Sequence, residues 1–267
     1  RTGIPFPTRR VGTESRSRGA PYQYNTNENQ SPMITPLGVR HRTRESFGQH
    51  FCPTCIADAD PFLRLTWRLR LFPVCTLHGT ILHDCCPVCG GTYQPHRRGF
   101  RACAHCQADL GASRTEVADG RVLALQLHNE RVLQGHAVTW PYLHGLYPIA
   151  FFRLQLSLLR AVVSPQWGER LRAGLQSHLG DVDFAFRNRR GALRSLKIAS
   201  VHDAMRAVEL LLRGWPAMLA GICGESESWA TWIVPEEARA NTPFVLREAL
   251  DCYLRPGSAP RNPQTRR

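Results

Sequence analysis

The chain has 267 residues, of which 43% are apolar, so it can bury a core and is not broadly disordered. Its formal net charge is +13, and only Lys197 among its 34 basic side chains is a lysine, a balance that favours polyanionic partners. The sequence has no run of 18 apolar residues and no hydrophobic segment near its start. We therefore expect a cytoplasmic protein without a membrane partner.

Both ends of the chain differ in composition from the middle. Residues 1–46 are rich in Arg, Ser, Thr, Gly, Pro and Asn and have no sustained apolar period, which predicts a flexible basic N-terminal segment. Residues 256–267 are rich in Pro and Arg, which predicts a flexible basic tail.

Residues 47–110 contain four pairs of metal-competent side chains, and two residues separate the members of each pair. A tight turn can bring such a pair onto one ion, and two pairs complete a tetrahedral zinc site. We therefore predict a double zinc-binding module of the zinc-knuckle or zinc-ribbon type, with two structural zinc ions. Paired in chain order, the ligands are Cys52, Cys55, Cys75 and His78 for one ion, and Cys86, Cys89, Cys103 and Cys106 for the other.

Other uses of these cysteines fit less well. Disulfides need an oxidising compartment, and a thioredoxin-like redox site uses one such pair instead of four. Iron–sulfur ligation stays open for the all-cysteine quartet. Catalytic zinc is disfavoured because two complete quartets leave no open coordination position. The spacing to Cys89 favours Cys86 over its neighbour Cys85 as ligand, and Gly90 stands where the turn needs a positive φ.

The connecting segments of this module also have a pattern. The residues between Cys55 and Cys75 are apolar and aromatic, which predicts a short helix or turn and a strand packed around the metal. Ile81 and Leu82 predict a second strand between the two sites.

Residues 111–255 predict a helical domain. Apolar residues repeat at three- and four-residue steps over 122–133, 149–163, 167–179, 200–215 and 242–253. Gly180 is a candidate C-cap, and the residues from Ser200 to Asp203 resemble a capping box. Short helices joined by tight turns permit a helix-turn-helix-like arrangement. The fold class we expect is therefore mainly α with a small zinc module.

One basic cluster lies between two of these predicted helices and contains no acid. It is a candidate surface for nucleic acid or an acidic partner, against the alternative of a solvated loop. Its members are Arg187, Arg189, Arg190, Arg194 and Lys197.

No motif predicts an enzyme. His128 and Glu130 form an H-x-E triplet, but a zinc deaminase also requires a downstream P-C-x-x-C, and only the single cysteines Cys223 and Cys252 follow. The sequence has neither a Walker-type phosphate loop nor a G-x-S-x-G elbow. This favours a binding or adaptor role.

Residues 31–110 resemble the TniQ family of transposition proteins. The segments that carry the resemblance are C-P-T-C at 52–55, L-T-W-R-L at 65–69, V-C-T-L-H-G at 74–79 and C-P-V-C-G-G at 86–91. They follow the family pattern of CPxC, LxWRL, VCxxHG and CPxCG in the same order. A weaker similarity continues at 186–190 and 213–216.

The resemblance implies zinc-stabilised folds, helix-turn-helix-like modules and a non-enzymatic role as a target-selecting adaptor. Such an adaptor links a target, either a DNA site or a CRISPR guide-RNA effector, to an AAA+ ATPase of the TnsC kind that regulates the transposase. Whether the protein forms a homodimer stays an open question. The alternative is a stand-alone, sequence-specific, zinc-containing DNA-binding protein, such as a TnsD-like site reader or a regulator.

Overall fold

The computed structural model describes residues 33–35, 49–165, 168–180, 182, 184, 196–235, 239 and 241–254. Pro32–Arg267 forms one compact unit. The tail 256–267 and most of the segment 1–46 lie outside the described residues, and so do Arg187, Arg189, Arg190 and Arg194.

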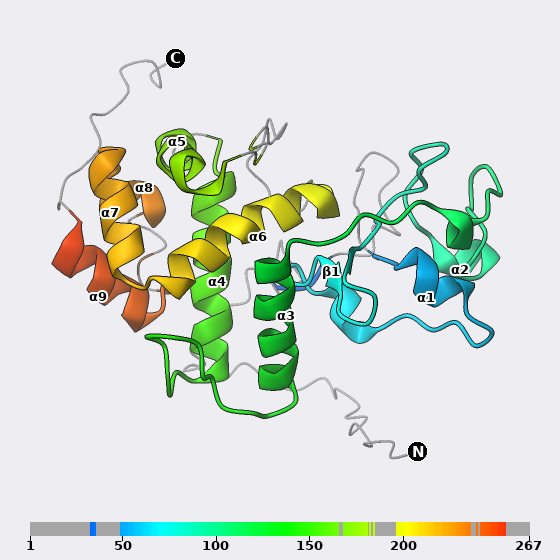
Figure 1. Cartoon of the computed structure of the whole chain (residues 1–267), viewed down its shortest axis with the longest axis horizontal. Coiled ribbons are helices and arrows are strands. Elements are labelled where there is room, and N and C mark those ends of the chain that lie inside the picture. Colours follow the sequence, from blue (N-terminus) through cyan, green and yellow to red (C-terminus); the bar gives the residue numbers. More distant parts are fainter. Residues whose placement is uncertain are drawn as a thin grey trace, which may run out of the picture. The chain divides into compact units, whose positions relative to one another are not determined.

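The described part of the chain is mainly helical, which confirms the mainly α part of the expected fold class (Figure 1). The first half contains only short elements: α1 (Pro53–Ala57), η1 (Leu65–Arg68), β1 (Val74–Cys75), β2 (Thr80–Ile81), α2 (Pro95–Arg98) and η2 (Leu110–Ala112). Strands β1 and β2 form an antiparallel pair in which Val74 faces Ile81 and Cys75 faces Thr80. This hairpin carries Cys75 and His78 at its turn.

The second half contains the longer helices. They are α3 (Gly120–Leu133), α4 (Pro148–Val163), α5 (Gly168–Leu179), α6 (Ile198–Arg213), α7 (Ala217–Glu225), α8 (Ala230–Ile233) and α9 (Phe244–Tyr253). Five of them coincide with the apolar repeats, and Gly180 ends α5 with the positive φ of +63° expected of a C-cap. The sequence analysis missed α7 and α8, which are too short to contain a clear repeat.

The predicted capping box at the start of α6 is wrong. The helix begins at Ile198, before Ser200, and its N-cap residue Lys197 makes no side-chain cap. Instead, the Ile198 N–H donates to Asp84 Oδ2 at 2.7 Å, so the acceptor comes from 114 residues earlier in the chain. A residue beside the second cysteine quartet therefore satisfies the first amide of α6.

The helices share one hydrophobic core that continues into the metal-ligand region. Helix α6 lies across α3 and α4 in Figure 1 and packs against both. The buried cluster that contains Leu158 and Leu211 also contains Trp67 and three cysteine ligands, Cys52, Cys55 and Cys75. The first quartet is therefore part of the main core.

Buried amide side chains join α3 to its neighbours. Asn129 on α3 and Gln155 on α4 are fully buried and exchange two hydrogen bonds, of 2.8 Å and 2.9 Å. Since each amide satisfies the other, the pair can be buried without an unpaired polar group.

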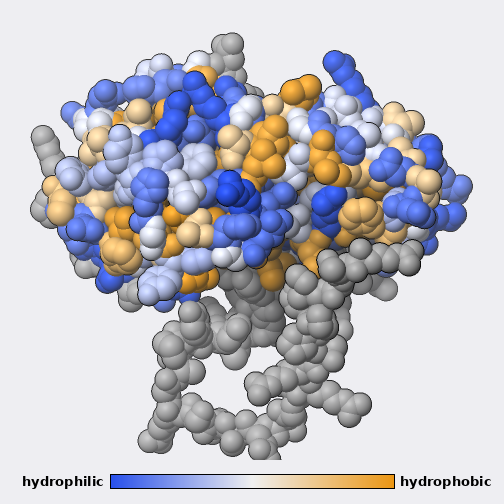
Figure 2. Space-filling view, turned by 60° about the horizontal axis from the view of Figure 1, so that its bottom comes forward, coloured by the Kyte–Doolittle hydropathy of each residue, from blue (hydrophilic) through white to orange (hydrophobic). Residues whose placement is uncertain are grey.

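The surface is mixed in character. In the face drawn in Figure 2, hydrophobic side chains interrupt the hydrophilic surface at several separate places. Within the described part of the chain, no single helix has the length and apolarity to cross a membrane. The pair α6 and α7, bent by 115°, meets that test only when the two helices are taken together.

Candidate metal centres

Three of the four ligand pairs form the same turn. In each, the residue after the second ligand has a positive φ, and its N–H donates to the carbonyl of the first ligand. This residue is Gly79 (φ +62°, 2.8 Å), Gly90 (φ +71°, 2.8 Å) or Gln107 (φ +65°, 3.1 Å). The expectation for Gly90 is confirmed. The fourth pair, Cys52 and Cys55, spans the N-terminal turn of α1 instead.

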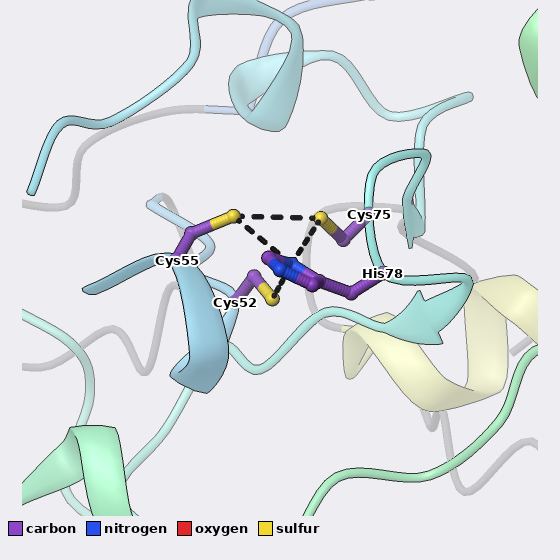
Figure 3. Close-up of side chains that lie close together, drawn as sticks. All are labelled: Cys52, Cys55, Cys75 and His78. Carbon is purple, nitrogen blue, oxygen red and sulfur yellow. Dashed lines mark hydrogen bonds between the residues drawn. The ribbon is translucent and has the colours of Figure 1, made fainter. Parts of the chain in front are cut away.

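The first quartet brings Cys52, Cys55, Cys75 and His78 together from α1 and the β1–β2 hairpin (Figure 3). The Cys55 and Cys75 sulfurs lie 3.7 Å apart. His78 Nδ1 lies 3.5 Å, 3.3 Å and 3.6 Å from the sulfurs of Cys52, Cys55 and Cys75. One imidazole nitrogen therefore faces all three thiols.

The second quartet brings together Cys86, Cys89, Cys103 and Cys106, whose sulfurs all lie within 4.8 Å of one another. The Cys86 and Cys106 sulfurs are 3.7 Å apart, as are those of Cys89 and Cys103. The four ligand pairs combine into two quartets in the way that their order in the chain predicts.

These distances fit four ligands around a single ion. In a tetrahedron with metal–sulfur bonds of about 2.3 Å and metal–nitrogen bonds of about 2.05 Å, two sulfurs lie about 3.75 Å apart and a sulfur and a nitrogen about 3.55 Å apart. A disulfide would bring two sulfurs to about 2.05 Å. In a cluster of two or four irons the four thiolates are divided among different irons, and thiolates on different irons lie farther apart. Both quartets can therefore hold one metal ion each.

Each quartet contains one cysteine whose pKa is lowered by its polar neighbours, whereas the pKa values of Cys55, Cys75 and Cys106 are raised. The thiol of Cys75 lowers the pKa of Cys52 to about 4, with the Cys55 N–H and the Thr80 hydroxyl, 3.7 Å away, acting in the same direction. In the second quartet burial raises the pKa of Cys103, but the N–H groups of Cys106 and His105 outweigh it and bring the pKa to about 7. Thiolates are the form that binds metals.

Side chains of α3 that are not metal ligands hold the first quartet in position. Gln126 on α3 accepts from the Val74 N–H at 2.9 Å and donates to the Val74 carbonyl, as a neighbouring strand would. The Thr76 hydroxyl donates to the Glu130 carboxylate on the same helix at 2.9 Å. Val74 and Thr76 are the neighbours of the ligand Cys75 in the chain, so α3 contacts the residues on both sides of this ligand. The sequence analysis missed Gln126 because an isolated polar residue in a helix carries no signal for such a contact.

Cys85 is not a member of the second quartet. Its backbone pairs with Thr92, whereas the sulfur of Cys86 meets that of Cys106. Burial and the neighbouring Asp84 carboxylate raise the pKa of Cys85 to about 11, which disfavours a thiolate there. Of the two remaining cysteines, Cys223 is buried and Cys252 is exposed.

The predicted basic cluster is represented only by Lys197, which is exposed just before α6. Its four arginines lie outside the described residues, so the cluster stays a prediction.

Searches with protein-family profiles, curated proteins and solved structures find no match to this chain. The TniQ resemblance therefore depends on the motif residues, and it stays a prediction.

Proposed function

We propose that the chain is a non-enzymatic adaptor protein organised by two structural zinc ions. The carrying observation is the pair of complete ligand quartets, each with distances that match a single tetrahedral ion. Four protein ligands leave no coordination position for a substrate or water, so each ion would stabilise the fold. The imidazole in the first quartet favours zinc there, because zinc readily takes mixed sulfur and nitrogen ligands.

The adaptor acts in target selection for a transposon of the TniQ kind. It links target DNA or a guide-RNA effector to an AAA+ regulator, and the transposase itself does the cutting. Support for this role comes from the order and spacing of the knuckles and from the ligand sets, which match the family pattern residue by residue. A stand-alone DNA-binding protein is the alternative.

The junction of α6 and α7 supports the helix-turn-helix-like part of the proposal. Only Gly214, Trp215 and Pro216 separate the two helices, and the helices are bent by 115° at this junction. Helix-turn-helix motifs join two helices at about 90–120° through a turn of three or four residues that often contains glycine.

Metal analysis and partner binding test the proposal together. Inductively coupled plasma mass spectrometry on the full chain is expected to find two zinc ions per chain and no stoichiometric iron. The protein is then mixed with a purified AAA+ ATPase of the TnsC kind, with and without duplex DNA, and complex formation is measured by size-exclusion chromatography with light scattering.

If the protein is an adaptor, we expect it to form a complex with the ATPase. Sequence-specific binding to one DNA site without any ATPase complex would instead favour the stand-alone DNA-binding protein. Absence of metal at either quartet would contradict the zinc proposal.

A further inference from the structure

The four ligands of the second quartet lie within a basic segment of the sequence. Between Cys85 and Ala108 the chain has three arginines, Arg97, Arg98 and Arg101, and two histidines, but no aspartate or glutamate. Helix α2 lies in the chain between the second and third cysteine ligands of this quartet, and its residues His96, Arg97 and Arg98 are exposed. We call residues 92–101 the basic loop.

Arg97 and Arg98 differ from five other arginines in the described part of the chain, which are paired with acidic side chains. Arg101, Arg170, Arg206, Arg213 and Arg239 each form an ion pair with an aspartate or glutamate. The first acid after the basic loop, Asp109, accepts two hydrogen bonds of 2.9 Å, from Nε and one terminal nitrogen of Arg101. The nearest acid before the loop, Asp84, is buried and accepts from Ile198. Neither acid is therefore available to neutralise Arg97 and Arg98.

Helix α7 does not provide a comparable surface. It would be the second helix of a helix-turn-helix, which reads the DNA groove in that motif. Yet it contains no arginine or lysine, and its exposed residues are Ala217, Gly221, Gly224 and Glu225. Small and acidic side chains cannot contact phosphates or base edges in the way that arginine does.

We propose that the basic loop of the second knuckle binds the phosphate backbone of duplex DNA through Arg97 and Arg98. Two adjacent exposed guanidinium groups suit phosphate oxygens, which arginine binds with two parallel N–H groups. Single-stranded nucleic acid would also need stacking platforms. Phe100, 37% exposed, is the one aromatic side chain exposed in this loop, which favours the duplex backbone.

The inference extends the proposed function, because it locates a nucleic-acid contact of the adaptor on the second metal centre. It also fails separately from that function, since zinc content and ATPase binding do not depend on it.

The salt dependence of DNA binding by the full chain tests the inference. The probe is a fluorescent 30-base-pair duplex of random sequence, titrated at several salt concentrations. Removal of two phosphate contacts in R97A/R98A is expected to flatten the slope of log K against log salt by about 1.8 and to weaken binding on the order of tenfold at low salt. R97K/R98K keeps both charges and is expected to retain most of the slope.

A second double variant, R131A/R247A, is a matched control, because it removes two exposed arginines from α3 and α9. It is expected to change the slope by less than half as much. An equal change in both double variants would overturn the inference, because the effect would then follow from net charge alone. Loss of zinc from R97A/R98A would also overturn it, since the arginines would then serve the metal centre. Competition by polyglutamate as effective as competition by DNA would point to an acidic protein partner and would equally reject it.

Discussion

The two candidate metal centres differ in how deeply they are built into the protein. In the first quartet all three cysteines are buried, Cys52 and Cys75 fully so, and His78 is exposed. In the second quartet Cys86 and Cys103 are buried, whereas Cys89 and Cys106 are exposed. The first candidate site therefore lies mostly in the core, and the second lies closer to the surface.

The surrounding apolar residues differ in the same way. The first quartet belongs to the main cluster, which continues through Trp67 and Phe72 to the helices. Cys86 and Cys103 belong instead to a small separate cluster with Phe51, Ile56, Tyr93 and Leu110. A small core cannot order its connecting loops without help, so a metal ion in the second quartet would be needed for the local structure there. The first metal would stabilise the whole unit.

The largest expected effect comes from two single variants, each of which removes one ligand from one quartet. Binding of a structural zinc contributes about 10–16 kcal/mol to folding, which matches or exceeds the stability of most domains. Cys75→Ala is therefore expected to unfold the helical part, with loss of most of the helical circular dichroism signal. Cys106→Ala is expected to lose one zinc and the protection of residues 86–108 against hydrogen exchange, while the helices remain.

Cys85→Ala is the control for this pair, since it changes a neighbouring cysteine that is not in a quartet. It should retain two metal ions. If Cys75→Ala and Cys106→Ala had the same effect on the helices, the distinction between a core site and a surface site would be wrong.

A smaller effect is expected from Gln126→Leu, which tests how α3 supports the first site. Leucine fits the buried position approximately but leaves the Val74 N–H and carbonyl without partners. Each unsatisfied buried group costs about 1–3 kcal/mol, so for two groups we expect a loss of roughly 2–6 kcal/mol in the free energy of unfolding by urea. Faster release of one zinc to a chelator should accompany it.

The same substitution at an exposed position of this region, Gln134→Leu, is the control. It is expected to change the free energy of unfolding by less than about 0.5 kcal/mol. An unchanged zinc release rate in Gln126→Leu would mean that the helix stabilises the hairpin without positioning the ligand.

The pairing of the ligands was predictable from the sequence because the information is local. A pair of ligands separated by two residues defines its own turn, and the four pairs follow one another in chain order. The five longer helices were also predictable, since each repeats apolar residues along one face over at least two turns.

The contacts that join the metal centres to the helices were not predictable. Asp84 caps α6 from 114 residues away, and Gln126 pairs with Val74 from a distance of 52 residues. In the sequence each is one polar residue among many, and its role depends on tertiary packing that no local pattern encodes. The Ser200–Asp203 pattern gave a wrong capping box for the same reason. The helix starts at Ile198, and the distant carboxylate of Asp84 accepts the hydrogen bond from its first amide.

The smallest expected effect concerns the turn after Cys106 and has the opposite sign. Gln107 has φ +65°, where the equivalent turns have Gly79 and Gly90. A side chain with a Cβ is strained in this region by about 1–2 kcal/mol, and glycine recovers part of that at an entropic cost in the unfolded chain. Gln107→Gly should therefore slow zinc loss from the second quartet and stabilise its knuckle by up to about 1 kcal/mol, measured by hydrogen exchange of residues 86–108. The reverse change, Gly90→Gln, should destabilise the same knuckle. Because this knuckle is separate from the main core, neither variant should alter exchange in α4 or α6, and a change there would show that the two centres are energetically coupled.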